Sequence, residues 1–198
     1  MKNLLTAIIF LGFSVGLTLT TETINAQNLQ GDFSIGAGLV FGTGVFDGEF
    51  GDELNNDLGI QVNGYYSVTP EIRIGGDFTY YFPQDFSESG QDFSYTIEAA
   101  VSEININGHY LFVNEADLVV YALAGINITR VSIEERDIDE FFGIDESFSS
   151  SESETGLNLG AGLEYNLDFA NFYAEAKLAN LGGDANQFVL GAGLRFNL

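Results

Sequence analysis

The chain has 198 residues, enough for one domain, and a formal net charge of −23 from 29 acidic and 6 basic residues. Nucleic-acid binding needs basic patches that displace counterions, so this charge balance excludes that class of partner. The lack of cysteine excludes disulfides, thiolate metal sites and a lipidated N-terminal cysteine, while 45% hydrophobic residues with 18 Phe and 9 Tyr exclude an acidic disordered chain.

Residues 1–26 have the pattern of a secretory signal peptide. Lys2 precedes the apolar run Leu4–Leu19, and a polar stretch then leads to Ile24–Ala26. A charged, an apolar and a small-residue region in this order predict export and cleavage after Ala26. The alternative is an uncleaved membrane helix, for which the apolar run is short. Residues 27–198 would then form one mature domain.

From residue 32 onward, apolar side chains recur at every second position, which predicts β-strands. A tight turn or a polar connector separates each such stretch from the next. The predicted strands are Asp32–Gly42, Leu58–Val68, Glu71–Phe82, Val101–Phe112, Leu118–Ile133, Gly156–Leu167, Phe172–Asn180 and Phe188–Leu198.

Two stretches depart from simple alternation. Ile97 and Val101 have the opposite parity to Ile104, which predicts a bulge or an exposed extension near residues 99–102. Leu118–Ile133 begins apolar on both faces, and we assign its polar and aromatic positions, Tyr121 among them, to the same side as the other polar residues.

The connectors alternate in length. Those after the second, fourth and sixth strands are short, whereas those after the first, third and fifth are long and acidic. The long connectors are residues 43–57, 83–95 and 134–154, and Gly182–Asn186 is shorter. Short turns at one end and long loops at the other predict an all-β fold, an eight-stranded antiparallel up-and-down transmembrane β-barrel.

The two faces of the strands indicate which side meets lipid. The apolar face carries aromatic residues near both strand ends with aliphatic residues between, as in barrels whose rings lie at the two membrane interfaces. The polar face is then the lumen, where unpaired charges are costly and must pair. Its ionisable residues are Arg73, Asp77, Glu103, His109, Glu164, Glu175, Lys177 and Arg195. We interpret them as a structural charge network.

With these features, residues 29–198 resemble the eight-stranded outer-membrane β-barrel family of the OmpA transmembrane domain and OmpX type. Such proteins end in a signal for the barrel-assembly machinery, with Gly five places before the end, an aromatic or apolar residue two before it and an aromatic residue last. Gly193 and Phe196 fit, and Leu198 departs from the usual terminal Phe. The resemblance implies contact with outer-membrane lipid, lipopolysaccharide and that machinery, as a monomer.

No catalytic or cofactor site is predicted. His109 is the only histidine and lies near the short-turn end, away from the outer rim where lipid A-modifying barrels place their catalytic residues. One histidine without cysteine does not support a zinc site. The Gly-Ala-Gly-Leu repeats precede no predicted helix, which disfavours a phosphate loop.

The acidic connectors leave one functional question open. Residues 47–57 and 134–154 are rich in carboxylates that could bind Ca²⁺ or bridge to lipopolysaccharide through divalent cations, although neither has the spacing of an EF-hand. Solvated surface loops are the simpler interpretation. Phe141, Phe142 and Phe148, if exposed, favour contact with a partner.

The leading functional prediction is a non-enzymatic outer-membrane protein with a structural or surface-interaction role. The alternatives are a narrow solute channel, a lipid-modifying enzyme and a soluble lipocalin-like barrel.

A membrane barrel and a soluble barrel differ in a simple measurement. We expect the folded chain to require detergent and to migrate differently on gels before and after heating, because a closed sheet with a lipid-facing apolar surface resists SDS until it is heated. A monomer that is soluble in plain buffer without detergent would rule out the membrane fold.

Overall fold

The computed structural model describes residues 28–43, 58–90, 93–139, 144–183 and 186–198. These contain nine strands and no helix that is long and apolar enough to cross a membrane. The strands are β1 Phe33–Gly42, β2 Leu58–Ser67, β3 Ile72–Tyr81, β4 Gln84–Ser89, β5 Phe93–Asn114, β6 Leu118–Asp139, β7 Ile144–Asn166, β8 Asn171–Leu181 and β9 Gln187–Asn197. The predicted signal peptide lies outside the described residues.

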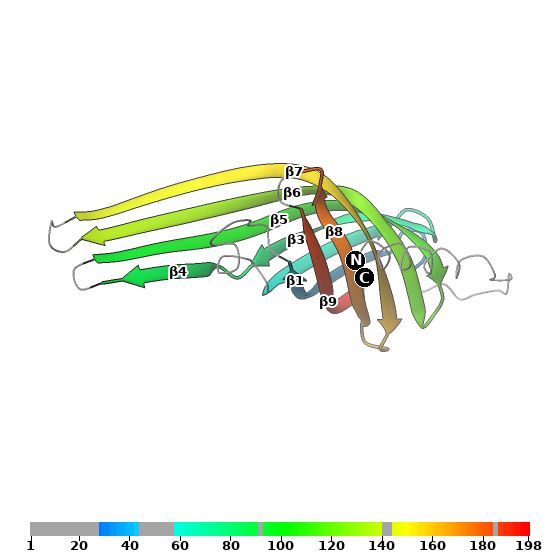
Figure 1. Cartoon of the computed structure of the whole chain (residues 1–198). Coiled ribbons are helices and arrows are strands. Elements are labelled where there is room, and N and C mark those ends of the chain that lie inside the picture. The colour runs from blue at the N-terminus through cyan, green and yellow to red at the C-terminus, as the bar shows by residue number, and fades with distance from the viewer. Residues whose placement is uncertain (1–27, 44–57, 91–92, 140–143, 184–185) are drawn as a thin grey trace, which may run out of the picture.

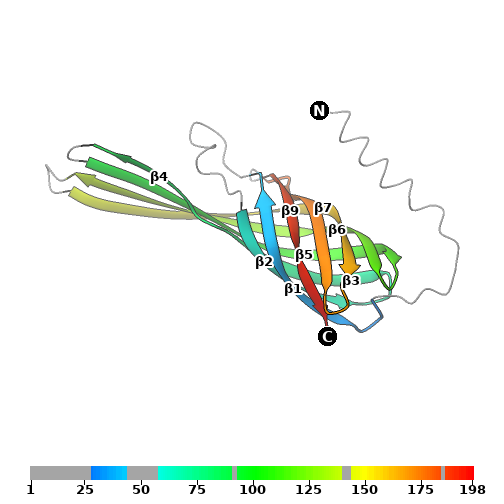
Figure 2. The same cartoon turned by 90° about the horizontal axis from the view of Figure 1, so that it is seen from below.

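The sheet closes into a ring. Its order is β3-β2-β1-β9-β8-β7-β6-β5-β4, and an additional pairing joins β3 to β5. Because β4 lies outside that closing pair, the ring consists of the eight remaining strands, all antiparallel (Figures 1 and 2). The first and last strands meet in register, with Ala37 opposite Leu194 and Ile35 opposite Phe196. The predicted eight-stranded barrel is therefore confirmed.

The apolar side chains face outward, as the alternation predicts. Exposed aromatic residues surround the short-turn end of the ring: Phe33, Tyr66, Tyr110, Phe112, Tyr165, Phe172 and Phe196. A second, sparser set lies toward the other end: Phe41, Tyr80, Phe82 and Phe188. The aliphatic residues between them are also exposed, Ile106 by 63% and Leu159 by 56%, which in water would be an unfavourable surface. This outer surface is the one that meets lipid.

Tight turns connect the strands at the short-turn end. Between β2 and β3, the hydroxyl of Thr69 accepts hydrogen bonds from the backbone amides of Glu71 and Ile72. Between β7 and β8, Asp168 has a left-handed backbone with φ 69°, and its amide donates to the side chain of Asn166 over 2.7 Å. The predicted short connections are therefore confirmed.

Two of the predicted long loops are mostly strands, which corrects the sequence interpretation. β5, β6 and β7 continue beyond the ring and, with β4 at one edge, form a four-stranded sheet, called here the extension (Figures 1 and 2). It includes most of residues 83–95 and 134–154. Serine and carboxylate side chains suggested loops, but unbroken pairing of β6 with both neighbours satisfies the backbone there. Residues 43–57, the remaining long connector, lie almost wholly outside the described chain.

The predicted irregularity near residues 99–102 is an extension of the strand and contains no bulge. β5 pairs with β6 without interruption from Phe93 to Leu111, and the register shifts only between Leu111 and Val113. Ile97 and Val101 keep the parity of the lumen residue Glu103, so their apolar side chains lie on the inner side of the sheet. The parity had suggested a bulge because we expected apolar residues only on the lipid side.

Candidate functional site

The seven ionic residues predicted for the lumen all lie inside the ring and are nearly inaccessible, with exposures of 8% or less. They form two layers. In the layer nearer the short turns, Glu164 accepts hydrogen bonds from both Arg73 and Arg195, so one carboxylate joins strands β3, β7 and β9. Arg73 also donates to Nδ1 of His109 over 3.0 Å, and Arg195 donates to Asn63 over 3.0 Å. Charge-assisted bonds of this kind are the strong ones in a protein interior.

Three tyrosines enclose this layer. The guanidinium of Arg195 lies 4.7 Å from the ring centres of both Tyr65 and Tyr173, and that of Arg73 lies 4.7 Å from Tyr121. His109 stacks on Tyr121 with ring centres 4.5 Å apart and an interplanar angle of 7°. Flat aromatic faces thus cover the cations where no carboxylate reaches them, which stabilises charges that water cannot solvate.

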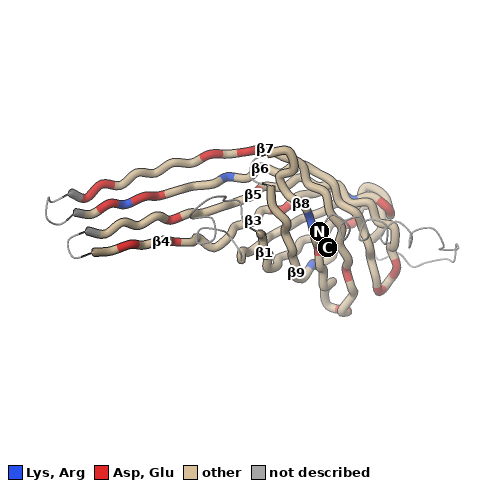
Figure 3. The backbone as a smooth tube through the Cα atoms, viewed as in Figure 1, with Lys and Arg blue, Asp and Glu red and all other residues tan. Residues whose placement is uncertain are grey.

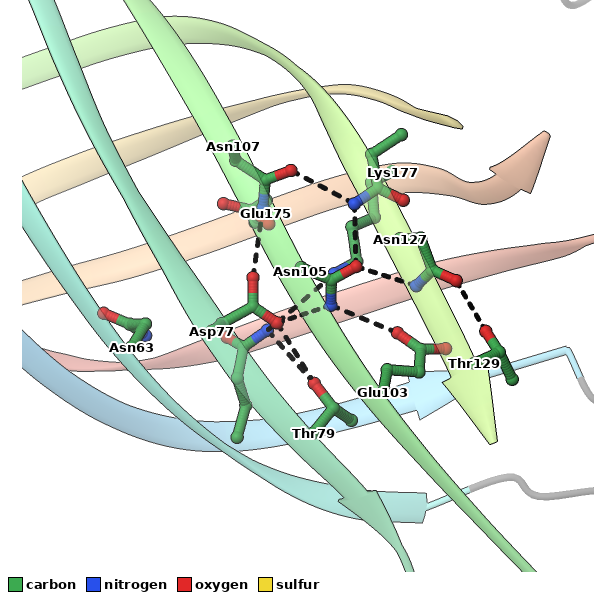
Figure 4. Close-up of polar contacts among 12 residues, drawn as sticks. Asn63, Asp77, Thr79, Glu103, Asn105, Asn107, Asn127, Thr129, Glu175 and Lys177 are labelled. Carbon is green, nitrogen blue, oxygen red and sulfur yellow. Dashed lines mark hydrogen bonds and ion pairs between the residues drawn. The ribbon is translucent and has the colours of Figure 1, made fainter. Parts of the chain in front are cut away.

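The second layer is built around Asp77 and Lys177, whose charged atoms are 3.6 Å apart (Figure 4). Asp77 accepts hydrogen bonds from Asn105 over 2.7 Å and from Asn107 over 3.1 Å. Asn105 in turn accepts a hydrogen bond from the amide of Asn127 over 2.7 Å (Figure 4) and another from the amide of Asn158 over 2.7 Å. Amide groups from β5, β6 and β7 therefore form one continuous hydrogen-bonded chain that begins at Asp77.

Two further acids join the network through neutral donors. Glu103 accepts from Gln187 and from Asn105, and Glu175 accepts from the hydroxyl of Tyr121 over 3.0 Å. Glu103 thereby connects β5 to β9, and Glu175 connects β8 to β6. The interior is thus fixed by hydrogen bonds across the ring as well as around it.

Two buried apolar clusters pack inside the ring beside the polar network. Toward the extension, the cluster of Val40, Tyr81, Val101, Ala179 and Val189 is almost fully buried. Toward the short turns, the cluster is Leu111, Val119, Tyr121 and Leu123. An eight-stranded ring is just wide enough for its interior side chains to fill it. Polar and apolar side chains share the same levels of the ring, since Val119 pairs with Glu164 and Ala179 with Gln187, and together they fill the lumen.

Sequence reasoning placed the ionic residues, Tyr121 and the alternating asparagines on the lumen face, but it assigned the network to the ionic residues alone. Tyr65, Tyr121 and Tyr173 contact the cations, and Asn105 connects the acids. The inward direction of the asparagines follows from their alternation with isoleucines in residues 103–107 and at 126–128, but their bonds to the acids do not. The tyrosine contacts span strands that are distant in the sequence and depend on the register of the closed ring.

Gly193, part of the predicted assembly signal, has a packing role in the folded barrel. A Cβ at this position would collide with the carbonyl oxygen of Ala37 and lie 2.5 Å from Cα of Gly38 and 2.8 Å from the ring of Tyr173. The neighbouring strand and the lumen tyrosine therefore require glycine here. Phe196 faces outward and Leu198 is 73% exposed at the end of the chain. Recognition of these residues by the assembly machinery stays a prediction.

The extension has two chemically different faces. Because pairing is uninterrupted, the face that continues the lumen side, called here the inner face, follows from the register. Its apolar side chains are Phe86, Tyr95, Ile97, Ala99, Val131, Ile133 and Phe148. Its carboxylates are Glu88, Glu135, Asp137, Glu146, Glu152 and Glu154.

The opposite side, the outer face, continues the lipid-facing surface and is mainly serine. Its ladder includes Ser147, Ser149, Ser151 and Ser153 on β7. Both arginines of the extension are on this face: Arg130 donates to Ser151, and Arg136 forms two hydrogen bonds with Asp145, which lower the pKa of that carboxyl below its ordinary value. The change from Ile104 and Ile128 to Ser102 and Arg130 marks where the lipid-facing belt ends.

The described residues contain no group of three or more His, Asp or Glu side chains placed to hold a metal ion. Within this part of the chain, the carboxylates of the extension lie along paired strands and are not gathered in a loop (Figure 3). Asp47–Asp57, the other predicted cation-binding segment, is outside the described residues, as are Phe141 and Phe142. Phe148 is described and is 65% exposed.

A closed antiparallel ring with a lipid-compatible outer surface and a packed polar interior defines a transmembrane β-barrel. Residues 9–196 match the family described as the outer membrane protein beta-barrel domain, so the chain belongs to that family. The protein is therefore a bacterial outer-membrane β-barrel protein.

Solved structures share the fold at low sequence identity. Ail, the attachment invasion locus protein of Yersinia pestis, solved in complex with the heparin analogue sucrose octasulfate, is 22% identical, with 85% of this chain and all of that chain covered at a TM-score of 0.54. Neisserial surface protein A is 16% identical, with 84% and 97% covered at a TM-score of 0.57. OprG of Pseudomonas aeruginosa is 12% identical, with 88% and 99% covered at 0.56. No curated protein matches the chain.

The shared carboxylate of Glu164 leads to a stability prediction. Glu164→Ala leaves two buried guanidinium groups without their counter-charge, so we expect the free energy of unfolding to fall by about 3–5 kcal/mol. The folded, heat-modifiable band can be followed through a urea series. Glu134→Ala, on the exposed outer face, is the matched control and should leave the midpoint nearly unchanged. Equal midpoints for the two variants would contradict this role for Glu164.

Gly193 gives a second prediction, with a control two residues away. Gly193→Ala forces the backbones of β1 and β9 apart, and we expect a loss of about 1–3 kcal/mol. At Gly191, the nearest contact of an added Cβ is Val40 at 3.5 Å, which is ordinary packing. Gly191→Ala should therefore unfold close to the wild type in the same urea series. If both variants behave alike, the packing explanation for Gly193 fails.

Proposed function

We propose that this chain is a non-enzymatic outer-membrane protein with a surface-interaction role, exported through a cleaved signal peptide of residues 1–26. One observation carries the proposal: a filled barrel holds a four-stranded acidic sheet that continues beyond the ring (Figures 1 and 3). In barrels of this architecture the short turns lie on the periplasmic side and the longer segments outside the cell. The extension would then project from the cell surface.

A role in contact is supported by the unpaired edge of the extension. β7 pairs with β8 only from Leu157 onward, so between residues 144 and 156 its described pairing is with β6 alone. Edge strands expose backbone donors and acceptors that can pair with another chain. Ail carries the description of an attachment protein. At 22% identity this likeness supports a shared fold alone. The contact role of the present chain is our proposal.

Lipid and lipopolysaccharide are the environment that we propose for the outer face. Its serine ladder and its two arginines begin where the apolar belt ends. Hydroxyl and guanidinium groups suit sugar and phosphate groups next to the membrane surface. Divalent cations at the acidic segments and the barrel-assembly machinery complete the proposed partners, with the barrel acting as a monomer.

A solute channel is the second candidate, and the lumen disfavours it. The described ionic side chains are engaged across the ring, and two buried apolar clusters pack beside them. Passage of an ion would break the ion pairs and hydrogen bonds that compensate the buried charges of the lumen, which is energetically costly.

The proposed role is tested by shortening the extension. Because Gln84 pairs with Ala99 and Ile133 with Ser150, removal of residues 84–99 and 133–150, each replaced by a two-residue turn, preserves the register of the ring. We expect the shortened barrel to remain heat-modifiable and the cells to lose adhesion to protein-coated surfaces. In planar bilayers, both forms should show no steady conductance.

Two results would contradict the proposal. Undiminished adhesion by cells that make the shortened barrel would remove the surface-interaction role. A steady single-channel current from the full-length protein would favour the channel instead.

A further inference from the structure

The inner face of the extension combines an apolar half with an acidic half. On β4 and β5, Phe86 lies opposite Ile97, and these pack with Tyr95, Ala99 and Ile133 into one cluster. On β6 and β7, the same face carries Glu135, Asp137, Glu146 and Glu152, with Phe148 exposed between them. Within this strip Ile97 and Ala99 are already buried by their neighbours, whereas Phe86 and Ile133 are half-buried and Phe148 is 65% exposed. A single sheet has no second layer to cover these remaining apolar side chains.

Charge separates the two faces further. The extension's two arginines, Arg130 and Arg136, lie on the outer face, so the described inner face contains carboxylates and no base. A polyanion such as the ligand of Ail would meet only like charges there. A second copy of this chain, with its own net charge of −23, would be repelled as well.

The position of the inner face argues against lipid as its occupant. It continues the lumen side of the strands, since Ile97 and Glu103 share one parity on β5, whereas the lipid-facing side continues into the serine ladder. A bilayer that surrounds the barrel therefore meets the outer face. The inner face is left to a partner that approaches from solution.

We propose that the inner face binds a cationic amphipathic peptide segment of another protein. Its apolar side would lie on Phe86, Ile133 and Phe148, and its Lys or Arg side chains would meet the carboxylates of β6 and β7. Three strand spacings make the sheet about 14 Å wide, enough for one helix of about 10–12 Å diameter. This inference rests on the proposed surface-interaction role and specifies the partner.

Crosslinking at single cysteines tests the location. The chain has no cysteine, so Phe148→Cys on the inner face and Ser149→Cys on the outer face each give one attachment point for a benzophenone. The probe is a synthetic Leu/Lys peptide of about 18 residues with one apolar side, added to the barrel in phosphatidylcholine nanodiscs. We expect crosslinking from position 148 and little from position 149. Equal crosslinking from the two positions would overturn the proposal. Equal retention of the peptide by nanodiscs that lack the barrel would also overturn it.

Charge reversal at adjacent residues tests the chemistry. Glu135→Lys on the inner face should weaken binding of the Leu/Lys peptide about fivefold to tenfold, while Glu134→Lys on the outer face should change it less than about twofold. Phe148→Ser should weaken it about tenfold through the apolar contact. Equal effects of the two lysine variants, or equally tight binding of a peptide of lysine alone, would overturn the proposal.

Two further outcomes are distinguished by separate measurements: occupation of the inner face by a second copy of the chain, and failure of the proposed surface-interaction role. Disulfide-linked dimers of Phe148→Cys at low protein concentration would identify a second copy as the occupant and overturn the peptide inference. Loss of adhesion on shortening the extension, combined with no effect of Glu135→Lys on peptide binding, would reject this inference while the surface-interaction role stands. Retained adhesion in the shortened barrel would reject that role itself.

Discussion

The narrowness of an eight-stranded ring is the constraint on which the rest of this structure depends. In lipid every backbone group must pair within the protein, so the sheet has to close, as it does where β1 meets β9 and β3 meets β5. A ring of this size leaves space only for side chains. Bulk water does not solvate the charged side chains inside this ring. The carboxylate of Glu164 therefore pairs with the guanidinium groups of both Arg73 and Arg195. Glycines such as Gly193 give the lumen tyrosines their space.

The barrel could be predicted from the sequence because a strand in lipid has a strong period of two. Phe188–Leu198 shows this pattern throughout, and the predicted direction of Arg195, into the lumen toward an acid, agrees with its bond to Glu164. Which acid it meets was not predictable, since Glu164 and Glu175 share the inward parity. The choice depends on the stagger of the strands around the ring, which one sequence does not contain. The same holds for the stacking of His109 on Tyr121.

The extension was missed for a different physical reason. Beyond the membrane neither face of a strand needs to be apolar throughout, so the contrast that identifies a lipid-facing strand disappears. Ser147–Ser153 alternates serine with phenylalanine, serine and glutamate, a composition that is typical of loops. Here the strands are held by pairing with β6, which already runs through the barrel. Ordering each residue of the extension costs backbone conformational entropy, and the continuous pairing along β6 offsets that cost.

The unbroken strands β5, β6 and β7 also limit how this protein can change over evolution. Their side chains keep one parity from the lumen to the tip of the extension. Unless a bulge absorbed it, the insertion of one residue would move every side chain beyond it on that strand to the opposite face of the sheet. The serines would then lie on the inner face, and the apolar and acidic residues on the outer face. Insertions and deletions in these strands should therefore be tolerated mainly in pairs on each strand and in matching positions on its neighbours. The length of the extension can vary between relatives, but its two faces are inherited together with the barrel beneath it.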